Sequence, residues 1–470
     1  PIDTAADVRA AVDRAKPAAI WWRELGFDGR KQRLRTWRSL IVQRIDEFAE
    51  LIHRENGKPV FDAIAELSIA VEHLDWASGA AQKVLGQHKV SSGLLAINHK
   101  ATLEYRPYGV VGVLGPWNYP VHTPMGSISY ALAAGNAVVF KPSEYTPGVG
   151  RWLAESFAEI VPEQPVFQLV TGYGETGAAL CRSGVDKLAF TGSPATGKKI
   201  MAACAETLTP VLVEAGGKDA LLVDADADLD AAADAAVWGG MSNAGQTCVG
   251  VERVYVHERV YDDFVSKVVK IAGDVRAGDD AEAQIGPITM PGQLAIIQRH
   301  IKDALARGGR ALVGGADAVG ERFVQPTVLV DVPEDSSAVR EETFGPTLTI
   351  AKVADMDEAI TKANDSKYAL ASTVFSKRRG MELARRLRSG MTAVNGVISF
   401  AGIPSLPFGG IGESGFGRIH GPEGLKEFAR PKAIARQRFR APLVLTTFSR
   451  TAKTDATVAK LITLLHGKRR

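Results

Sequence analysis

The stretch GVVGVLGPWNYP, residues 109–120, joins a short apolar run to a loop that contains two prolines. Further short apolar runs follow at residues 137–140, 166–170, 187–190 and 211–213, most of them with Gly or Pro close behind. Helix-like segments lie between most of these runs. Short apolar runs that alternate with helices are typical of parallel strands joined by crossover connections.

A second series of apolar runs continues this pattern toward the C-terminus, at residues 220–223, 253–256, 327–330 and 348–350. Helical segments, such as residues 294–306 and 381–387, alternate with them. We find no internal repeat and no low-complexity linker. The sequence therefore predicts an α/β fold with two doubly wound domains and a boundary near Gly216-Gly217.

The first hundred residues are predicted to be helical. Apolar residues recur three and four positions apart from residue 34 through residue 52, as one face of a helix requires. Asn56-Gly57, with Pro59 beyond it, is then a helix stop.

Length and composition indicate a globular enzyme of several domains. The 470 residues are too many for one compact core, and 46% hydrophobic with 23% charged residues excludes disordered and fibrous classes. Charged residues between Asp3 and Arg14 leave no room for the apolar core of a secretory signal, and no uncharged apolar run could cross a bilayer. Three scattered cysteines are typical of a reducing compartment, so we expect a cytoplasmic protein.

The formal net charge of +3 is distributed unevenly. Residues 430–470 contain eleven Lys or Arg and one Asp, a net charge of +10, so the other 429 residues carry −7. A nucleic-acid groove would spread charge and aromatic rings over one folded face, so we expect no nucleic-acid partner. A solvated or subunit-bridging end is the favoured interpretation of this basic tail. A weak peripheral contact with an anionic membrane or an acidic partner is the alternative.

Three side chains far apart in sequence are candidates for catalysis. Cys248 ends NAGQTC after a helical stretch, although a lone cysteine is more often a small buried hydrophobe. Glu214 ends a strand before a glycine pair, where α/β sheets place ligands, and its alternative is a solvated strand-end acid. Asn118 lies between the two prolines of its loop, as a fixed oxyanion donor requires, unless it only closes a turn.

The segment AFTGSPATGKK, residues 189–199, is a candidate phosphate site. It joins a strand to a helix, where glycines free backbone N–H groups at a helix N-terminus. The spacing nearly matches a P-loop, but Lys199 stands where the Ser or Thr that binds magnesium should be. A nucleotide triphosphatase is therefore not favoured.

Two further polar segments are candidates for nucleotide contacts. Lys141 and Glu144 of KPSE follow a strand and could engage a ribose, and EETFGP at residues 341–346 adds an acid and an aromatic ring. Surface charge is the alternative for both. We expect no metal site, because the histidines form no helical metalloprotease pair and the cysteines form no CxxC.

Seven motifs follow one another along the chain: PWNYP, KPSEYTP, FTGSPATG, VEAGGK, NAGQTC, EETFGP and LPFGGIGESGFG, the last at residues 406–417. Together they resemble the aldehyde dehydrogenase superfamily. The last motif, with Arg418, His420 and Gly421, is most similar to its class 3 and related bacterial branch. The resemblance implies an NAD(P)-dependent enzyme that oxidises an aldehyde to a carboxylic acid through a thiohemiacetal and a thioester.

The resemblance also implies a role for each candidate residue. Cys248 would be the nucleophile, Asn118 would hold the oxyanion with the backbone N–H of Cys248, and Glu214 would activate the hydrolytic water. The implied cofactor residues are Trp117 in the substrate mouth and cofactor site, Lys141 and Glu144 at the adenosine ribose, Gly192, Ser193 and Gly197 near the pyrophosphate, Glu342 at the nicotinamide ribose and Phe344 at the nicotinamide end.

The implied family fold has two Rossmann-like domains and a small bridging sheet that builds dimers or tetramers. Residues 1–87 and 108–215 would bind NAD(P), and residues 216–427 would form the catalytic domain. Residues 88–107 and 428–440 would form the oligomerisation segments, with the basic tail at 441–470.

Two residues depart from the family pattern. Ala215 follows Glu214 where members commonly carry Leu, so the position of Glu214 is less constrained, and Pro194 stands where many carry Thr. A CoA-acylating aldehyde dehydrogenase is one alternative, but it needs no hydrolytic base. A catalytically silent homologue is another, but it should have lost Cys248 or Glu214.

Cofactor choice favours NAD, because Glu144 can accept hydrogen bonds from ribose hydroxyls and would repel a 2′-phosphate, while Lys141 leaves NADP as a second option. The expected mouth residues are mostly aromatic or apolar: Trp117, Tyr119, His122, Val249 and Phe400. They mildly favour a medium-chain or aromatic aldehyde.

Overall fold

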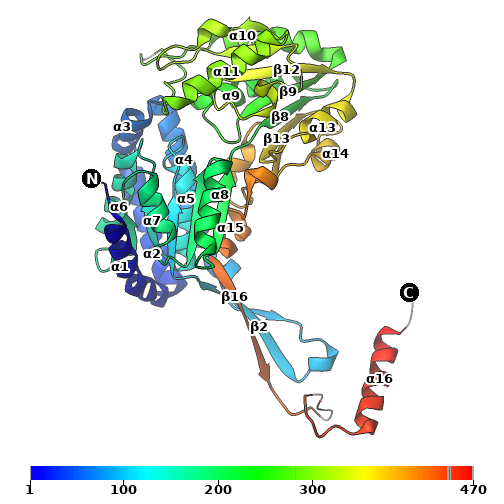
Figure 1. Cartoon of the computed structure of the whole chain (residues 1–470). Helices are drawn as coiled ribbons and strands as arrows, with labels where there is room; N and C mark the ends of the chain where they lie inside the picture. Colours follow the sequence, from blue (N-terminus) through cyan, green and yellow to red (C-terminus); the bar gives the residue numbers. More distant parts are fainter. Residues whose placement is uncertain (1, 281, 442–443, 445, 468–470) are drawn as a thin grey trace. The chain divides into compact units, whose positions relative to one another are not determined.

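The computed structural model describes residues 2–280, 282–441, 444 and 446–467. The chain forms two compact units (Figure 1). Unit 1 comprises residues 1–85 and 107–430, and unit 2 comprises residues 86–106 and 431–470.

The N-terminal half of unit 1 contains a six-stranded sheet of order β15-β7-β6-β3-β4-β5, parallel except for β15. Its elements are α1 (Ala5–Glu24), α2 (Gly26–Gln43), α3 (Ile45–Asn56), α4 (Val60–Leu85), β3 (Val110–Leu114), α5 (His122–Ala134), β4 (Ala137–Lys141), α6 (Pro147–Ile160), β5 (Phe167–Leu169), α7 (Gly174–Cys181), β6 (Lys187–Gly192), α8 (Pro194–Ala205) and β7 (Val211–Ala215).

The second half of unit 1 contains a seven-stranded sheet of order β10-β11-β12-β9-β8-β13-β14, in which only β10 is antiparallel to its neighbour. Its elements are β8 (Asp219–Val223), α9 (Leu229–Met241), β9 (Val251–His257), α10 (Tyr261–Asp274), α11 (Gly292–Ala306), β10 (Arg310–Val313), β11 (Thr327–Val330), α12 (Ser337–Arg340), β12 (Thr347–Val353), α13 (Met356–Asn364), β13 (Ala371–Phe375), α14 (Gly380–Arg386) and β14 (Met391–Val394), followed by β15 (Gly415–Phe416) and α15 (Gly421–Glu427).

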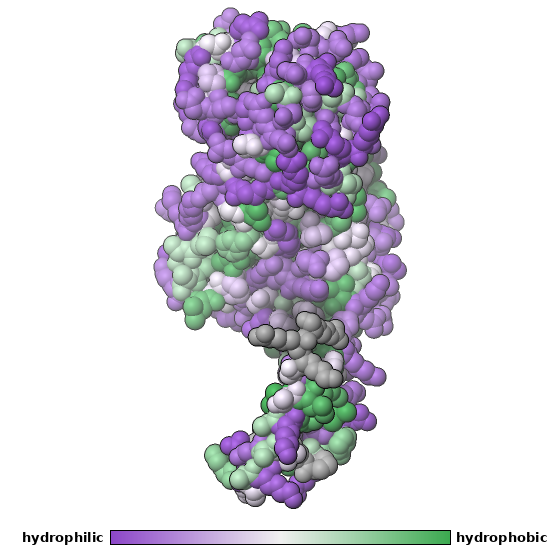
Figure 2. Space-filling model, turned by 90° about the vertical axis from the view of Figure 1, so that its right-hand side faces the viewer, coloured by the Kyte–Doolittle hydropathy of each residue, from purple (hydrophilic) through white to green (hydrophobic). Residues whose placement is uncertain are grey.

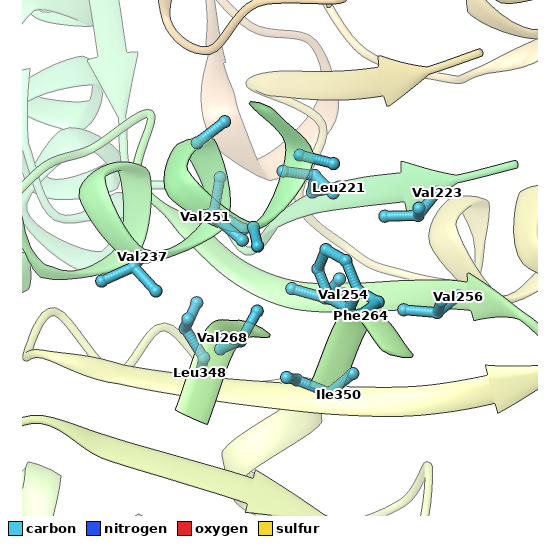
Figure 3. Packing of buried hydrophobic residues seen from close by; sticks show 14 of the residues in the cluster. Leu221, Val223, Val237, Val251, Val254, Val256, Phe264, Val268, Leu348 and Ile350 are labelled. Atoms are coloured by element: carbon cyan, nitrogen blue, oxygen red, sulfur yellow. The ribbon is translucent and has the colours of Figure 1, made fainter. Parts of the chain in front are cut away.

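Side-chain alternation along β8 explains why both faces of this sheet are covered. Leu221 and Val223 point into a cluster with residues of α9 and α10, such as Phe264, which Figure 3 shows from close by. Leu222 points the other way, into a cluster built with α13 and α14. β8 is apolar from Ala220 to Val223 and is thus buried on both sides, as expected for parallel sheets covered by helices.

These sheets confirm the predicted α/β fold with parallel sheets, and the differences are local. The helical spacing expected through residue 52 is broken at Arg44, which has φ −112° and separates α2 from α3. The apolar face continues across the break, because Ile41, Phe48 and Ile52 are all buried. Spacing alone could therefore not locate the break.

Within the two large sheets of unit 1, four strands have no counterpart among the predicted runs: β10, β13, β14 and β15. β15 lies within residues 216–427, which we expected to form the catalytic domain, yet Gly415 pairs antiparallel with Glu214 of β7 in the first sheet. β15 has two residues, too few to form a recognisable strand pattern. Its pairing with the first sheet could therefore not be predicted from the sequence.

Unit 2 contains a three-stranded sheet of order β1-β2-β16, made by β1 (His88–Val90), β2 (His99–Pro107) and β16 (Ala429–Gln437). The basic tail contains a helix, α16 (Ala452–His466). Hydrophobic residues are exposed on this unit (Figure 2), among them Leu94, Ile97 and Leu464. Among the described residues, no helix combines the length and the apolar character that crossing a membrane requires.

Asn136 joins three parts of unit 1 at the start of β4. Its buried side chain accepts a hydrogen bond from the backbone N–H of Gly109 at 3.0 Å. It donates two, to the carbonyl oxygens of Ala131 and Phe428, both at 2.9 Å.

We predict that Asn136→Ala lowers the free energy of unfolding by about 3 kcal/mol, because three buried backbone groups lose their partner. Urea denaturation measures this change. Asn364→Ala is the matched control, since its bonds to Arg386 and Arg388 lie at the surface, where water replaces them, and we expect about 0.5 kcal/mol. Equal losses for the two variants would contradict the importance of burial at Asn136.

Candidate active site

The loop that carries Cys248 begins with an unusual left-handed turn. After α9, Asn243, Ala244 and Gly245 have φ values of 53°, 56° and 71° in succession. Only glycine adopts this conformation without cost. A Cβ atom at Gly245 would also overlap the backbone of Gly345, so main chain packs directly on main chain here.

Gln246 holds the turn from inside. Its amide nitrogen donates to the carbonyl oxygens of Asn243 at 2.9 Å and Pro287 at 3.2 Å. Its amide oxygen accepts from the backbone N–H of Thr289 at 2.8 Å. This buried side chain therefore fixes the backbone two residues before Cys248.

Asn118 connects the loop after β3 to the loop that carries Cys248. Its side-chain nitrogen donates to the carbonyl oxygen of Gln246 at 2.9 Å. Its own carbonyl oxygen accepts from Lys58 Nζ at 2.9 Å and from Asn243 Nδ2 at 3.0 Å. The amide is buried and held at both its backbone and its side chain, with one N–H of the side chain left for a further acceptor.

A fully buried ion pair supports Asn118. Lys58 Nζ lies 2.6 Å from Glu66 Oε2, and both side chains are inaccessible. Glu66 Oε1 in turn accepts from the backbone N–H groups of Val121 at 2.7 Å and His122 at 3.0 Å. A buried pair of this kind is stable only when its remaining donors and acceptors are satisfied, as they are here.

The sulfur of Cys248 lies 3.8 Å from Glu214 Oε1. Burial raises the pKa of the Cys248 thiol well above its usual range, and the carboxylates of Glu214, Glu342 and Asp219 raise it further. Burial also raises the pKa of Glu214 to about 7, although hydrogen bonds from Cys248 and Thr191 oppose the shift. The thiol is thus the resting form, and its nearest proton acceptor titrates near neutrality.

Glu342 lies on the other side of the glycine pair that follows Glu214. Its Oε1 accepts from the backbone N–H of Gly217 at 3.0 Å, and a Cβ atom at Gly216 would overlap its carboxylate. Burial, followed by the charge of Glu252, raises the pKa of Glu342 to about 8. The glycine pair is therefore required for this acid to approach the strand end.

A cavity of about 120 Å³ opens beside Cys248. It is lined by eighteen residues: Asp62, Ala65, Glu66, Ile69, Tyr119, His122, Thr123, Glu214, Trp238, Ser242, Asn243, Thr247, Cys248, Val249, Ile398, Ala401, Phe408 and Ile419. Of the expected mouth residues, Tyr119, His122 and Val249 line it. Trp117 lines a different cavity, and Ala401 and Phe408 lie where we expected Phe400.

A second cavity, of about 630 Å³, lies at the carboxyl ends of β3, β4 and β6. Five of the expected cofactor residues line it: Trp117, Lys141, Glu144, Gly192 and Ser193. Tyr173 and Gly174 at the start of α7 line it too, as does Thr196 in the first turn of α8. Arg182 and Lys199 line the cavity beside Lys141. Backbone N–H groups at helix N-termini, cations and a carboxylate are the groups that a dinucleotide requires, so these residues fit NAD(P).

Three expected cofactor residues lie elsewhere. Gly197 lies in α8, where a Cβ atom would press on Val213, so its absence of a side chain serves the contact between helix and strand. Glu342 lies by Gly217, as described above. The ring of Phe344 meets that of Trp117 edge to face, with 5.6 Å between centroids.

Thr191 connects the two cavities. It lines the larger one, and its hydroxyl donates to Glu214 Oε2 at 3.5 Å. The parallel pairing of β6 with β7 places Thr191 directly beside Glu214. The acid that touches the sulfur is therefore also in contact with the wall of the dinucleotide cavity.

Sequence reasoning missed several residues that build this site. Lys58 stands within the helix stop at Asn56-Gly57, which hid its role, and Glu66 is one of many acids on a helix. The buried pair of Lys218 and Glu252 was missed as well, although Lys218 belongs to the VEAGGK motif. Glu252 accepts from the backbone N–H groups of Thr343 and Phe344, so this pair positions the EETFGP segment. Among the described residues, no group of three or more His, Cys, Asp or Glu side chains could hold a metal ion.

Comparison with known proteins gives consistent matches over nearly the whole chain. A family model described as "Aldehyde dehydrogenase family" matches residues 1–434. The chain is 37% identical over 446 residues to 4,4'-diapolycopene aldehyde oxidase of Methylomonas sp, covering 94% of this chain and 84% of that protein. It is 35% identical over 442 residues to glutarate-semialdehyde dehydrogenase of Pseudomonas aeruginosa, covering 92% and 89%.

A solved structure, the NAD-dependent aldehyde dehydrogenase from Sinorhizobium meliloti, superimposes with a TM-score of 0.90 at 33% identity. The match covers 95% of this chain and 90% of that one.

We predict that Gly245→Ala lowers the free energy of unfolding by about 3 kcal/mol or more, because a methyl group there overlaps the Gly345 backbone and the left-handed φ is strained. Thermal or urea unfolding measures this loss. Gly273→Ala is the control, because Gly273 lies in helix α10 with open space around it and should gain up to about 1 kcal/mol. If Gly245→Ala is as stable as the wild type, the turn does not have the packing described.

Proposed function

The chain belongs to the aldehyde dehydrogenase family, and from that premise we propose how its own residues divide the reaction. It is an NAD(P)-dependent oxidoreductase that oxidises an aldehyde to a carboxylic acid. The observation that carries the assignment of residues is the 3.8 Å contact between Cys248 Sγ and Glu214 Oε1, at the wall of an apolar cavity.

The first step is the transfer of the thiol proton to Glu214. The raised pKa of Cys248 keeps the sulfur protonated at rest, and Glu214, with a pKa of about 7, is the acceptor in contact with it. The thiolate then attacks the aldehyde carbon, and the carbonyl oxygen gains the negative charge.

Asn118 receives that charge. Its side-chain N–H and the backbone N–H of Cys248 form the oxyanion hole, and the hydrogen bond from Asn118 to Gln246 keeps the amide from turning away. A bound nicotinamide ring supplies the acceptor for the hydride that leaves the thiohemiacetal carbon. What remains on Cys248 is a thioester.

Glu214 acts a second time when the thioester is hydrolysed. Once it has released the first proton, its carboxylate takes a proton from a water molecule, whose oxygen attacks the thioester carbon. The C–S bond breaks, the carboxylic acid leaves, and Cys248 regains its proton. Because hydrolysis needs this base, the CoA-acylating alternative is not favoured.

Each cofactor residue would hold a different part of the dinucleotide. Lys141 and Glu144 would bind the adenosine ribose, and Gly192 with Ser193 would bind the pyrophosphate. Trp117 and Phe344 would hold the nicotinamide end, and Glu342 would accept a hydrogen bond from its ribose. The contact of Gly197 with Val213 supports a packing role instead, so we leave it out of the cofactor site. Glu144, which would repel a 2′-phosphate, supports a preference for NAD.

We also propose a function for each part of the chain. Residues 1–87 and 108–215 bind the dinucleotide, and residues 216–427 supply the nucleophile. The sheet of unit 2 joins subunits into a dimer or tetramer, which is supported by its exposed apolar residues, such as Val90 and Leu95. The sparse cysteines support a cytoplasmic address.

We predict that Cys248→Ala lowers aldehyde oxidation at least about 10⁴-fold, because no other group forms the thioester. Reduction of NAD in a steady-state assay measures the loss, and titration calorimetry should show that the cofactor still binds. Cys204→Ala is the control, because this buried thiol lines neither cavity, and it should keep its activity. A Cys248→Ala enzyme that retains its rate would identify another nucleophile.

We predict that kcat/KM of the wild type rises with pH through about 7 and is level above it, because Glu214 acts as a base only when deprotonated and its pKa is raised to that value. Glu214→Gln should lose this dependence and lower kcat by about 10² to 10⁴-fold. Rapid-mixing kinetics should show a slowed burst of NADH equal to the enzyme sites. A wild-type rate in steady turnover would remove Glu214 from this role.

A further inference from the structure

One wall of the cavity beside Cys248 is a face of helix α4. Asp62, Ala65, Glu66 and Ile69 line the cavity and are spaced three and four residues apart, so they share one side of the helix. Two of these four side chains are carboxylates. This wall therefore presents acids to whatever enters.

The other walls are largely apolar. Apolar side chains from separate segments line them: Trp238, Val249, Ile398, Ala401, Phe408 and Ile419. The uncharged polar residues Thr123, Ser242, Asn243 and Thr247 complete the lining. The volume of about 120 Å³ is close to the roughly 150 Å³ of a dry cavity that holds benzene. Trp238 is 54% exposed and forms part of the entrance, where a longer chain would leave the cavity.

No positive charge faces this space. Among the described residues that line the cavity there is neither Lys nor Arg. Lys58 lies behind the wall, where its amine is engaged by Glu66, by the Asn118 carbonyl oxygen and by the ring of Tyr119 at 4.1 Å. Burial lowers the pKa of His122 to about 3, so its imidazole is neutral at neutral pH.

The carboxylates that line the cavity differ in how much of their negative charge is offset by neighbouring groups. Glu66 is neutralised by Lys58 and by two backbone N–H groups. Glu214 is reserved for the reaction. Asp62 lines the cavity, and the nearby amine of Lys58 is already bonded to Glu66. Burial, together with the charge of Glu66, raises the pKa of Asp62, and the charge of Lys58 opposes the shift, so this carboxylate is only partly compensated.

We infer that this cavity selects aldehydes with an uncharged, mainly apolar body and excludes aldehydes that carry a second carboxylate, with Asp62 as a specificity-determining residue. The inference rests on the proposed function. A substrate carboxylate would lose its water, find no cation and meet a like charge, and each of these effects is unfavourable. The glutarate semialdehyde named for one relative therefore does not carry over to this chain, despite 35% identity.

The test compares two aldehydes of the same carbon backbone, 4-oxobutanoate and its methyl ester, which differ in charge. We expect kcat/KM, measured by reduction of NAD, to be about 100-fold higher for the ester. Hexanal and benzaldehyde should also be oxidised. Equal values for acid and ester, or a preference for the acid, would overturn the inference while leaving the proposed function intact. Inactivity with all four aldehydes would instead contradict the proposed function, and the inference with it.

A variant tests the part played by Asp62. Asp62→Asn removes the charge at nearly constant volume, and we expect the ester-to-acid ratio to fall about tenfold. Glu72→Gln, an exposed acid on the same helix outside the cavity, is the matched control and should leave the ratio unchanged. An unchanged ratio in Asp62→Asn would overturn the role of Asp62. The wild-type ratio tests the exclusion itself without any variant.

Discussion

The hydrogen bond from Asn118 Nδ2 to the carbonyl oxygen of Gln246 is the interaction on which the site depends. It joins the loop after β3 to the loop that presents the sulfur, and the two loops come from different halves of unit 1. Lys58 and Asn243 hold the carbonyl oxygen of the same residue, so Asn118 cannot shift without breaking three buried bonds. An oxyanion donor is effective when it is already in place before charge develops, and these bonds keep it in place.

The electrostatics around the sulfur are those of a site poised for proton transfer. Glu214, Glu342 and Asp219 all raise the pKa of Cys248, and a hydrogen bond with the backbone of Val249 opposes them. The nearby buried lysines are each committed to another acid, Lys58 to Glu66 and Lys218 to Glu252. The nucleophile is therefore activated by proton transfer to Glu214, a base whose pKa is about 7, rather than held as a preformed thiolate.

Much of the fold and the class of reaction could be predicted from the sequence, because both are indicated by short stretches of neighbouring residues. β3 and the first four residues of β4 are continuous apolar runs, and motifs such as NAGQTC stand where the chain turns. What could not be predicted depends on contacts between distant residues. β15 is two residues long and gains its place from β7, while Lys58 and Glu66 look like ordinary surface charges until the fold buries them. The cavity walls come from separate segments, and no spacing along the chain reveals that Asp62 and Phe408 share a space.

The left-handed turn before Cys248 rests on the backbone of Gly345 and on buried amides, whereas the cavity in front of the sulfur is bounded by side chains. Amino-acid substitutions therefore affect the turn and the cavity differently. Substitutions of apolar wall residues such as Phe408 and Ile419 can alter which molecules are admitted without displacing the nucleophile, because the turn before Cys248 is held by main-chain packing and by buried amides of other residues. In proteins that evolve from this fold, the choice of substrate can thus change while the reactivity of the cysteine is kept.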